Sequence, residues 1–100
     1  MSYARSFTVA ITVSGNSGSG AFVFPKISGI IIKTIAIDAP GAAIYDWVLS
    51  DADGYPMTGE TAASGDETYY VNLPMSASGS ISMVNASNGT YNVKIWAEYN

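Results

Sequence analysis

The stretch that decides the fold is Gly29-Ile-Ile-Ile-Lys-Thr-Ile-Ala-Ile-Asp38, which holds five isoleucines in ten residues. β-branched side chains are stiff at χ1 and favour the pleated surface of a strand. Because side chains alternate along a strand, one face is expected to hold Ile30, Ile32, Thr34 and Ala36, and the other Ile31, Lys33, Ile35 and Ile37. Both faces would then be apolar. We therefore predict that the second face is covered, either by a segment before Pro25 or after Glu60 or by another subunit.

Outside this stretch, short segments rich in β-branched and aromatic residues alternate with turn signals. The predicted strands are residues 6–13, 21–24, 43–50, 57–60, 68–73, 79–85 and 90–99. Segments 14–20 and 61–67 are predicted loops, and 85–89 is a predicted hairpin loop because Asn-Gly suits positive φ. The expected fold class is all-β: a single antiparallel β-sandwich over residues 1–100, jelly-roll or Ig-like, with seven to nine short strands and no substantial helix.

Charge and composition exclude several classes of function. The 100 residues are 48% hydrophobic and only 12% charged, with a net charge of −4 and four scattered cations. A phosphate backbone requires clustered Lys or Arg, so we expect no nucleic-acid partner. The apolar runs are too short for a membrane span, and the N-terminus lacks the pattern of a signal peptide. We expect a protein made in a cytoplasm that binds no membrane.

The chain contains no histidine and no cysteine, so Ser-His-Asp and Cys-His catalysis are impossible. We predict no catalytic residue and no cofactor. The acidic residues leave a small carboxylate-based hydrolase as one hypothesis, since glycoside hydrolysis needs only two carboxylates. Asp51-x-Asp53-Gly54 is the nearest pattern to a metal site, because calcium loops alternate acidic ligands before a glycine. Its alternative interpretation is an Asx-type turn between strands.

The aromatic residues are the better candidates for binding. Trp96 falls on the polar face of its predicted strand, and Tyr55, Tyr69 and Tyr70 lie near loops. Exposed Trp and Tyr are typical of protein interfaces and sugar-binding platforms, although Trp96 packing over the outer sheet face is an equal alternative. Together with the second face of residues 29–38, the predicted interface is Ile31, Ile35, Ile37, Tyr55, Tyr69, Tyr70 and Trp96.

The order and residue composition of these segments are similar to those of a known class of protein. The segments that carry the likeness are residues 7–13, 29–37, Tyr45-Asp-Trp-Val-Leu-Ser-Asp51, Gly79-Ser-Ile-Ser-Met-Val84 and Tyr91-Asn-Val-Lys-Ile-Trp96. The chain thereby resembles the capsid decoration, or cement, proteins of tailed bacteriophages. The resemblance implies a non-enzymatic virion protein on the capsid surface, made in the host cytoplasm. It implies the major capsid protein as partner and a homo-oligomer, trimer or dimer, with no site residue carried over.

A second hypothesis is a carbohydrate- or receptor-binding β-module of a phage fibre or adhesin. It predicts that Trp96 or one of the three tyrosines forms an exposed platform. The hydrolase hypothesis instead predicts two carboxylates that face each other in a cleft.

Overall fold

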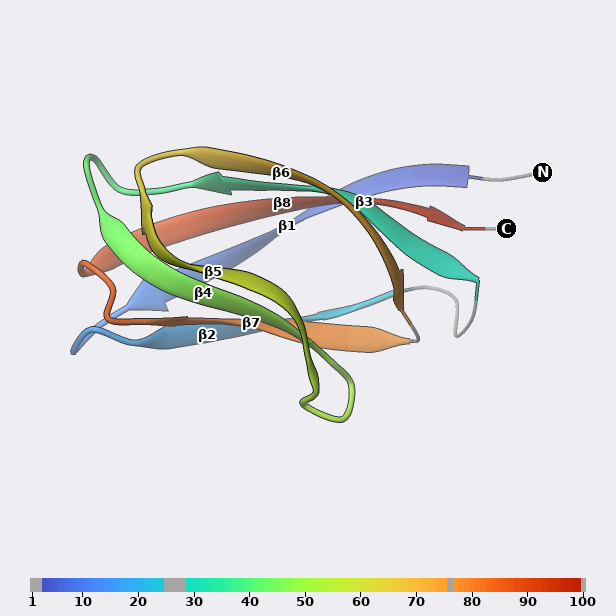
Figure 1. Ribbon diagram of the computed structural model, residues 1–100, viewed down its shortest axis with the longest axis horizontal. Helices are drawn as coiled ribbons and strands as arrows, with labels where there is room; N and C mark the ends of the chain where they lie inside the picture. Colours follow the sequence, from blue (N-terminus) through green and yellow to red (C-terminus); the bar gives the residue numbers. More distant parts are fainter. Residues whose placement is uncertain (1–2, 25–28, 76, 100) are drawn as a thin grey trace.

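The computed structural model describes residues 3–24, 29–75 and 77–99, which form two four-stranded antiparallel sheets packed face to face (Figure 1). The strands are β1 (Tyr3–Val13), β2 (Gly18–Val23), β3 (Ile30–Asp38), β4 (Ile44–Asp51), β5 (Pro56–Ser64), β6 (Glu67–Met75), β7 (Ser78–Val84) and β8 (Gly89–Tyr99). The first sheet has the order β1-β8-β3-β6 and the second β2-β7-β4-β5. The described part of the chain contains no helix that could cross a membrane. The predicted all-β sandwich is confirmed.

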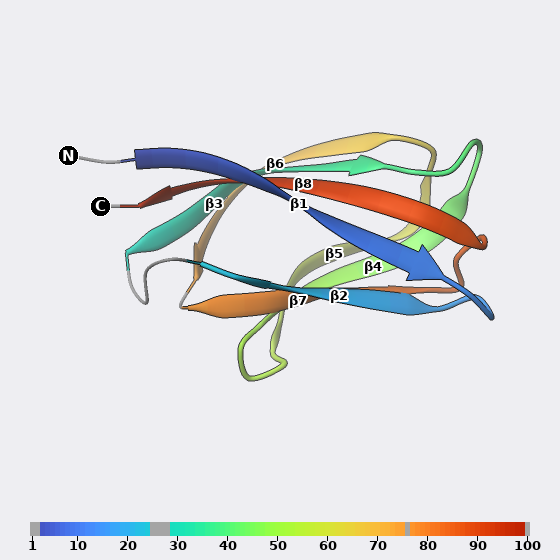
Figure 2. The same ribbon diagram turned by 180° about the vertical axis from the view of Figure 1, so that it is seen from behind.

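The strand pairing is that of one long hairpin rolled up on itself. β1 pairs with β8, β2 with β7, β3 with β6 and β4 with β5. Rolling then brings β8 beside β3 and β7 beside β4. The start of β1 and the end of β8 consequently lie side by side (Figure 2). An Ig-like sandwich would instead pair its first two strands in one sheet, so of the two predicted topologies the jelly roll is correct.

The core lies between the sheets and follows the predicted alternation in most strands. Tyr45, Trp47 and Leu49 of β4 are fully buried, whereas Ile44 and Val48 point outward. In β8, alternate residues from Tyr91 to Ala97 are buried in the same way. Three phenylalanines, Phe7, Phe22 and Phe24, form a cluster with ring centroids 5.4–5.7 Å apart. A continuous apolar layer therefore joins the two sheets.

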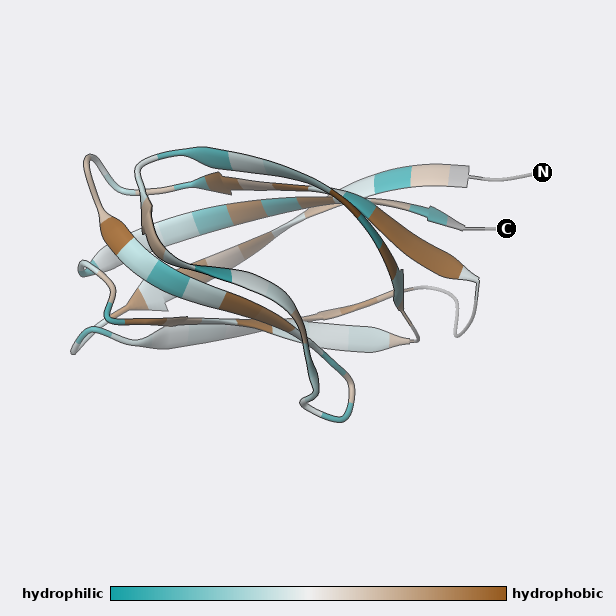
Figure 3. Ribbon diagram, in the orientation of Figure 1, coloured by the Kyte–Doolittle hydropathy of each residue, from teal (hydrophilic) through white to brown (hydrophobic). Residues whose placement is uncertain are grey.

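The face assignment predicted for residues 29–38 is wrong beyond Lys33. The register of β3 shifts between Ile32 and Thr34 against both neighbouring strands. Against β8, Lys33 is the extra residue of a β-bulge, whereas against β6 the single Lys33 stands opposite Val71 and Asn72. The bulge reverses the alternation. Ile30, Ile32, Ile35 and Ile37 all point into the core, with exposed fractions of 2% or less. Only Ile31 lies on the outer face, where it is partly exposed. The start of β3 is accordingly brown in Figure 3, but the strand is not apolar on both faces.

Two predicted loops are partly strand. β2 begins at Gly18, where a Cβ would lie 2.5 Å from the carbonyl oxygen of Thr12, so the glycine allows β1 and β2 to approach closely. β5 continues to Ser64 through Ala62, whose φ is +55°. Both segments consist mostly of small residues and glycine, a composition that is tolerated because they pair on only one side at a sheet edge.

Two further boundaries differ from those predicted. β6 does not end before Pro74 but continues to Met75. Proline is tolerated there because β6 is an edge strand. Residues 85–89 are not a hairpin loop, since β7 and β8 belong to different sheets. The positive φ of Asn85 and Gly89 instead allows the chain to cross the sandwich.

Candidate interaction surfaces

The structure separates the residues of the predicted interface. Ile35 and Ile37 are part of the core, so their assignment to a partner-facing surface is corrected by the bulge at Lys33. Tyr69 also points inward, and its ring centroid lies 5.0 Å from that of Trp47. The residues left on the outside are Ile31, Tyr55, Tyr70 and Trp96. Their role in binding stays a prediction.

Trp96 and Tyr70 lie in one row across the outer face of the first sheet. Thr34 of β3 is paired with both residues, and Ser6 of β1 completes the row. Tyr70 is 84% exposed and Trp96 is 42% exposed. The Nζ of Lys94 lies 5.3 Å from the centroid of the Trp96 ring, a cation–π contact that covers part of the indole. Trp96 is therefore half covered by its own sheet, and Tyr70 is the freer of the two aromatic side chains.

Asp51 organises the turn between β4 and β5. Its Oδ1 accepts hydrogen bonds from the backbone N–H groups of Asp53 and Tyr55, each 2.9 Å long. The backbone N–H of Gly54 donates to the carbonyl of Asp51, and Gly54 has a φ of +82°. This is the geometry of the Asx-type turn. Within the described residues, no group of three or more acidic side chains is placed to hold a metal ion. Tyr55, at the tip, is 69% exposed.

The outer face of the second sheet has small and aliphatic side chains that sequence reasoning did not single out. Its outward residues are Ser19, Ala21, Val23, Ile44, Asp46, Val48, Ser50, Ser78, Ser80, Ser82 and Val84. We call these residues the serine–valine face. Its valines and Ile44 are more than a third exposed, and Val23 reaches 78%. The signal was present in the sequence, because Ile44 and Val48 flank Asp46 on the face of β4 opposite Trp47.

A groove of about 720 Å³ runs along this face where β4 meets β5. Val48, Met57 and Val84 supply its apolar lining, and Asp46 adds a carboxylate. Glu60 also borders the groove, but it pairs with Trp47 and so lies on the inner side of β5. β5 can lie this close to β4 because residue 59 is glycine. A Cβ at that position would fall 2.2 Å from the carbonyl oxygen of Trp47. The groove is open to solvent along its length, unlike the enclosed pockets that bury small ligands.

Asp46 is the best-fixed charge in this groove. Its Oδ1 accepts a 2.8 Å hydrogen bond from the backbone N–H of Ala62, and its Oδ2 accepts a 2.9 Å hydrogen bond from the amide of Asn85. The hydrogen bond from Ala62 has the larger effect and that from Asn85 the smaller, and both hold the pKa of Asp46 below its usual range. Each carboxylate oxygen keeps a lone pair for a further donor. The carboxylate is thus ionised, oriented and able to bind a cation.

Charge is divided unequally between the two sheets. Among the described residues, the cations Arg5, Lys33 and Lys94 all belong to the first sheet. The second sheet and its β4–β5 turn carry only acidic residues, namely Asp46, Asp51, Asp53 and Glu60. Lys26 lies outside the described residues. The serine–valine face is therefore nearly uncharged at its centre and acidic along the β4–β5 side.

The open side of the sandwich, between the edge strands β5 and β6, contains two buried polar atoms. Neither Nε1 of Trp47 nor the hydroxyl of Tyr69 has a hydrogen-bond partner among the described residues. Desolvation by burial, and then the neighbouring Glu60 carboxylate, raise the pKa of Tyr69 to about 12. Tyr69 is consequently neutral at physiological pH.

No protein-family model and no curated protein matches this chain. Several solved structures share its fold. A chain of the acid-stable capsid structure of Helicobacter pylori bacteriophage KHP30 is 10% identical with a TM-score of 0.54, over 100% of this chain and 94% of that one. The pre-peptidase C-terminal domain of a Bacillus anthracis collagenase is 10% identical with a TM-score of 0.55, over 93% and 87%. PirA is 14% identical with a TM-score of 0.52, over 94% and 93%. At these identities the likeness concerns the fold alone.

Proposed function

We propose that this chain is a non-enzymatic structural protein of a bacteriophage virion, which binds the outside of the capsid and stabilises it. The observation that carries the proposal is the match to a chain of the KHP30 capsid structure. The alignment spans the whole of this chain and nearly the whole of that one, so the two are of similar length. A jelly roll of this size, present as a separate chain in a capsid, fits the role of a small accessory component.

The surface supports a role in packing against other proteins. Few residues are charged, and the outer face of the second sheet consists mostly of serine and aliphatic side chains. Exposed apolar residues occur on both outer faces. Contiguous apolar surface of this kind is typical of interaction sites. The proposed partner is the major capsid protein of the same particle, with this chain as a homo-oligomer, a trimer or a dimer, on the virion surface.

The acidic residues argue against a hydrolase. Asp46 lies on the outer face of β4, whereas Glu60 pairs with the buried Trp47, so the two carboxylates do not face each other. The hydrogen bonds to Asp46 also favour its ionised form, whereas a general acid needs a raised pKa. The groove also does not exclude water. We therefore propose that the chain has no catalytic activity.

Binding to shells tests this proposal. Purified chain is mixed with undecorated capsids of the phage whose genome encodes it, and the capsids are sedimented. We expect saturable co-sedimentation and a higher temperature of capsid disruption. Absence of binding under all salt conditions would overturn the proposal. Light scattering of the free chain tests the oligomeric state separately. A monomer that still binds capsids would contradict only the proposed homo-oligomer and leave the proposed capsid binding intact.

A second candidate function rests on the exposed row of Trp96 and Tyr70, which could stack on sugar rings. In this case the chain would be a carbohydrate- or receptor-binding module of a fibre or adhesin. Tryptophan fluorescence is a selective probe, since the only other tryptophan, Trp47, is buried. Glycans that bind the row should change the emission of the wild type and leave that of Trp96→Phe unchanged.

A further inference from the structure

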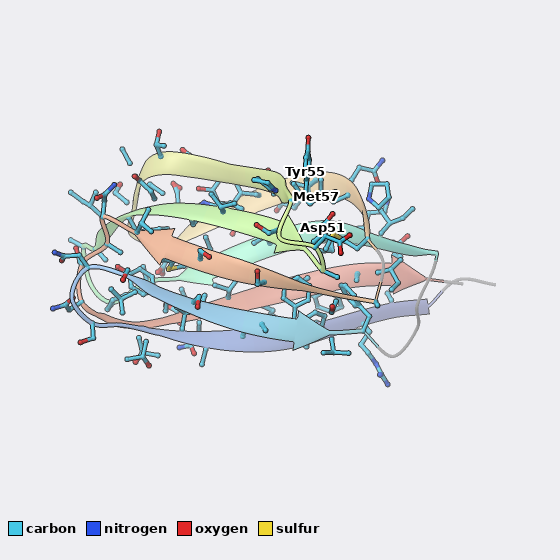
Figure 4. All side chains as sticks on the ribbon, turned by 90° about the horizontal axis from the view of Figure 1, so that it is seen from below. Asp51, Tyr55 and Met57 are labelled. Atoms are coloured by element: carbon cyan, nitrogen blue, oxygen red, sulfur yellow. The ribbon has the colours of Figure 1, made fainter. Side chains whose placement is uncertain are left out.

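We propose that the serine–valine face is the side that contacts the capsid, and that its groove receives a lysine or arginine side chain of the capsid protein. This inference rests on the proposed function and identifies its contact surface. Of the seven large hydrophobic residues that are exposed in the described chain, four lie on this face: Val23, Ile44, Val48 and Val84. Figure 4 views the molecule from this side and shows Asp51, Tyr55 and Met57 together at the β4–β5 end.

The lining of the groove matches the two parts of a basic side chain. Lysine and arginine bury an aliphatic stem against apolar surface while keeping the charged head at a polar edge. Val48, Met57 and Val84 provide the apolar surface, and the carboxylate of Asp46 provides the acceptor. Asp46 is already held in place by Ala62 and Asn85, so little further ordering is needed for it to bind a cation.

A second copy of the chain fits this face poorly. Two identical faces in a two-fold contact would bring the acidic β4–β5 sides of both copies into one interface, with no cation of the second sheet to offset them. The cations of the first sheet could meet this face in a head-to-tail contact. However, the two outer faces lie on opposite sides of the sandwich, so that contact would continue as an open filament instead of closing. A different protein with a basic surface fits better.

The test compares an arginine on each face in the capsid co-sedimentation experiment. Val48→Arg occupies the groove with an arginine that belongs to this chain itself. Thr8→Arg is the matched control, because Thr8 is an exposed β-branched residue halfway along β1, on the first sheet's outer face. We expect Val48→Arg to weaken binding roughly tenfold or more and Thr8→Arg to leave it unchanged. Asp46→Asn should weaken binding several-fold and reduce its dependence on salt. Circular dichroism and urea midpoints verify folding, and Ser82→Arg replaces Val48→Arg if the latter does not fold.

Each outcome separates this inference from the proposed function. If the wild type binds and Thr8→Arg, not Val48→Arg, abolishes binding, the other face is the contact and this inference is wrong. If binding is lost in neither variant, the contact lies on an edge or an end, and the inference is again wrong. If the wild type forms dimers or filaments that Val48→Arg dissolves, the occupant is a second copy. If the wild type does not bind capsids at all, the proposed function itself fails.

Discussion

Ile31 and Ile35 stand four positions apart on β3, yet the bulge at Lys33 puts them on opposite faces. Replacing Ile35 with alanine removes a fully buried side chain, so the free energy of unfolding should fall by about 2–5 kcal/mol. Ile31→Ala changes a partly exposed position and should cost about 1 kcal/mol or less. Urea denaturation of the two variants measures the difference. Equal losses would mean that the alternation continues through Lys33 without a bulge.

The buried tyrosines make stability fall in alkali. The pKa of Tyr69 is raised to about 12 from 10.0, and burial also raises the pKa values of Tyr45 and Tyr91. Because these pKa values are raised in the folded protein, the unfolded chain loses the same protons at a lower pH. The stabilisation is therefore complete below pH 10 and is lost as the pH rises from 10 toward 12. Urea midpoints measured across this range should decline steadily.

Tyr69→Phe isolates one contribution to this alkaline loss. The variant should decline less steeply above pH 10 than the wild type. At neutral pH it should be as stable as the wild type or more so, because the hydroxyl that it removes is buried without a partner among the described residues. A variant whose alkaline decline matched that of the wild type would show that Tyr69 does not contribute.

At the scale of the elements, strands with an apolar face on the core were predictable, including the edge strand β1, whereas the small and polar parts of the edge strands β2 and β5 were not. β4 and β8 alternate cleanly because one face of each packs on the core. The inner face of β3 could not be predicted, since one inserted residue reverses the alternation and a bulge has no composition of its own. β5 was largely missed because an exposed edge strand needs no apolar pattern. For the same reason the groove was missed, as Val48 and Gly59 come together only through the β4–β5 ladder.

Edge strand β5 also contains a strained residue. Ala62 has a φ of +55°, and its N–H donates to Asp46. This conformation costs a non-glycine residue about 1–2 kcal/mol. Glycine at this position would remove that cost, but its greater freedom in the unfolded chain offsets part of the gain in stability. Ala62→Gly should therefore raise the free energy of unfolding by up to about 1 kcal/mol. The neighbouring control Ala63→Gly, at a buried position, should lower it. Thermal or urea unfolding checks the two signs, and stabilisation by both or by neither contradicts the argument.

At the scale of the whole molecule, every strand pair joins the first half of the chain to the second. The six ladders are β1–β8, β8–β3, β3–β6, β2–β7, β7–β4 and β4–β5, and none lies within β1–β4 or within β5–β8. The β1–β8 ladder pairs Tyr3 with Tyr99. Such long-range pairing loses conformational entropy in closing large loops before the strand contacts stabilise the fold, so folding should take about milliseconds to seconds. The same topology explains why the sheets could not be assembled from local sequence signals.

The division between halves can be tested by cutting the chain in the β4–β5 turn. Fragments 1–52 and 53–100 contain β1–β4 and β5–β8, so neither alone can form any of the observed ladders. We expect each fragment to be unfolded by circular dichroism, and an equimolar mixture to regain sheet structure. Trp47 reports on the assembly, because its ring packs against Tyr69 of the other fragment. Its emission should shift to shorter wavelength only on mixing, since its strand partners Glu60 and Met83 both lie beyond the cut. A native-like spectrum from either fragment alone would contradict the jelly-roll pairing.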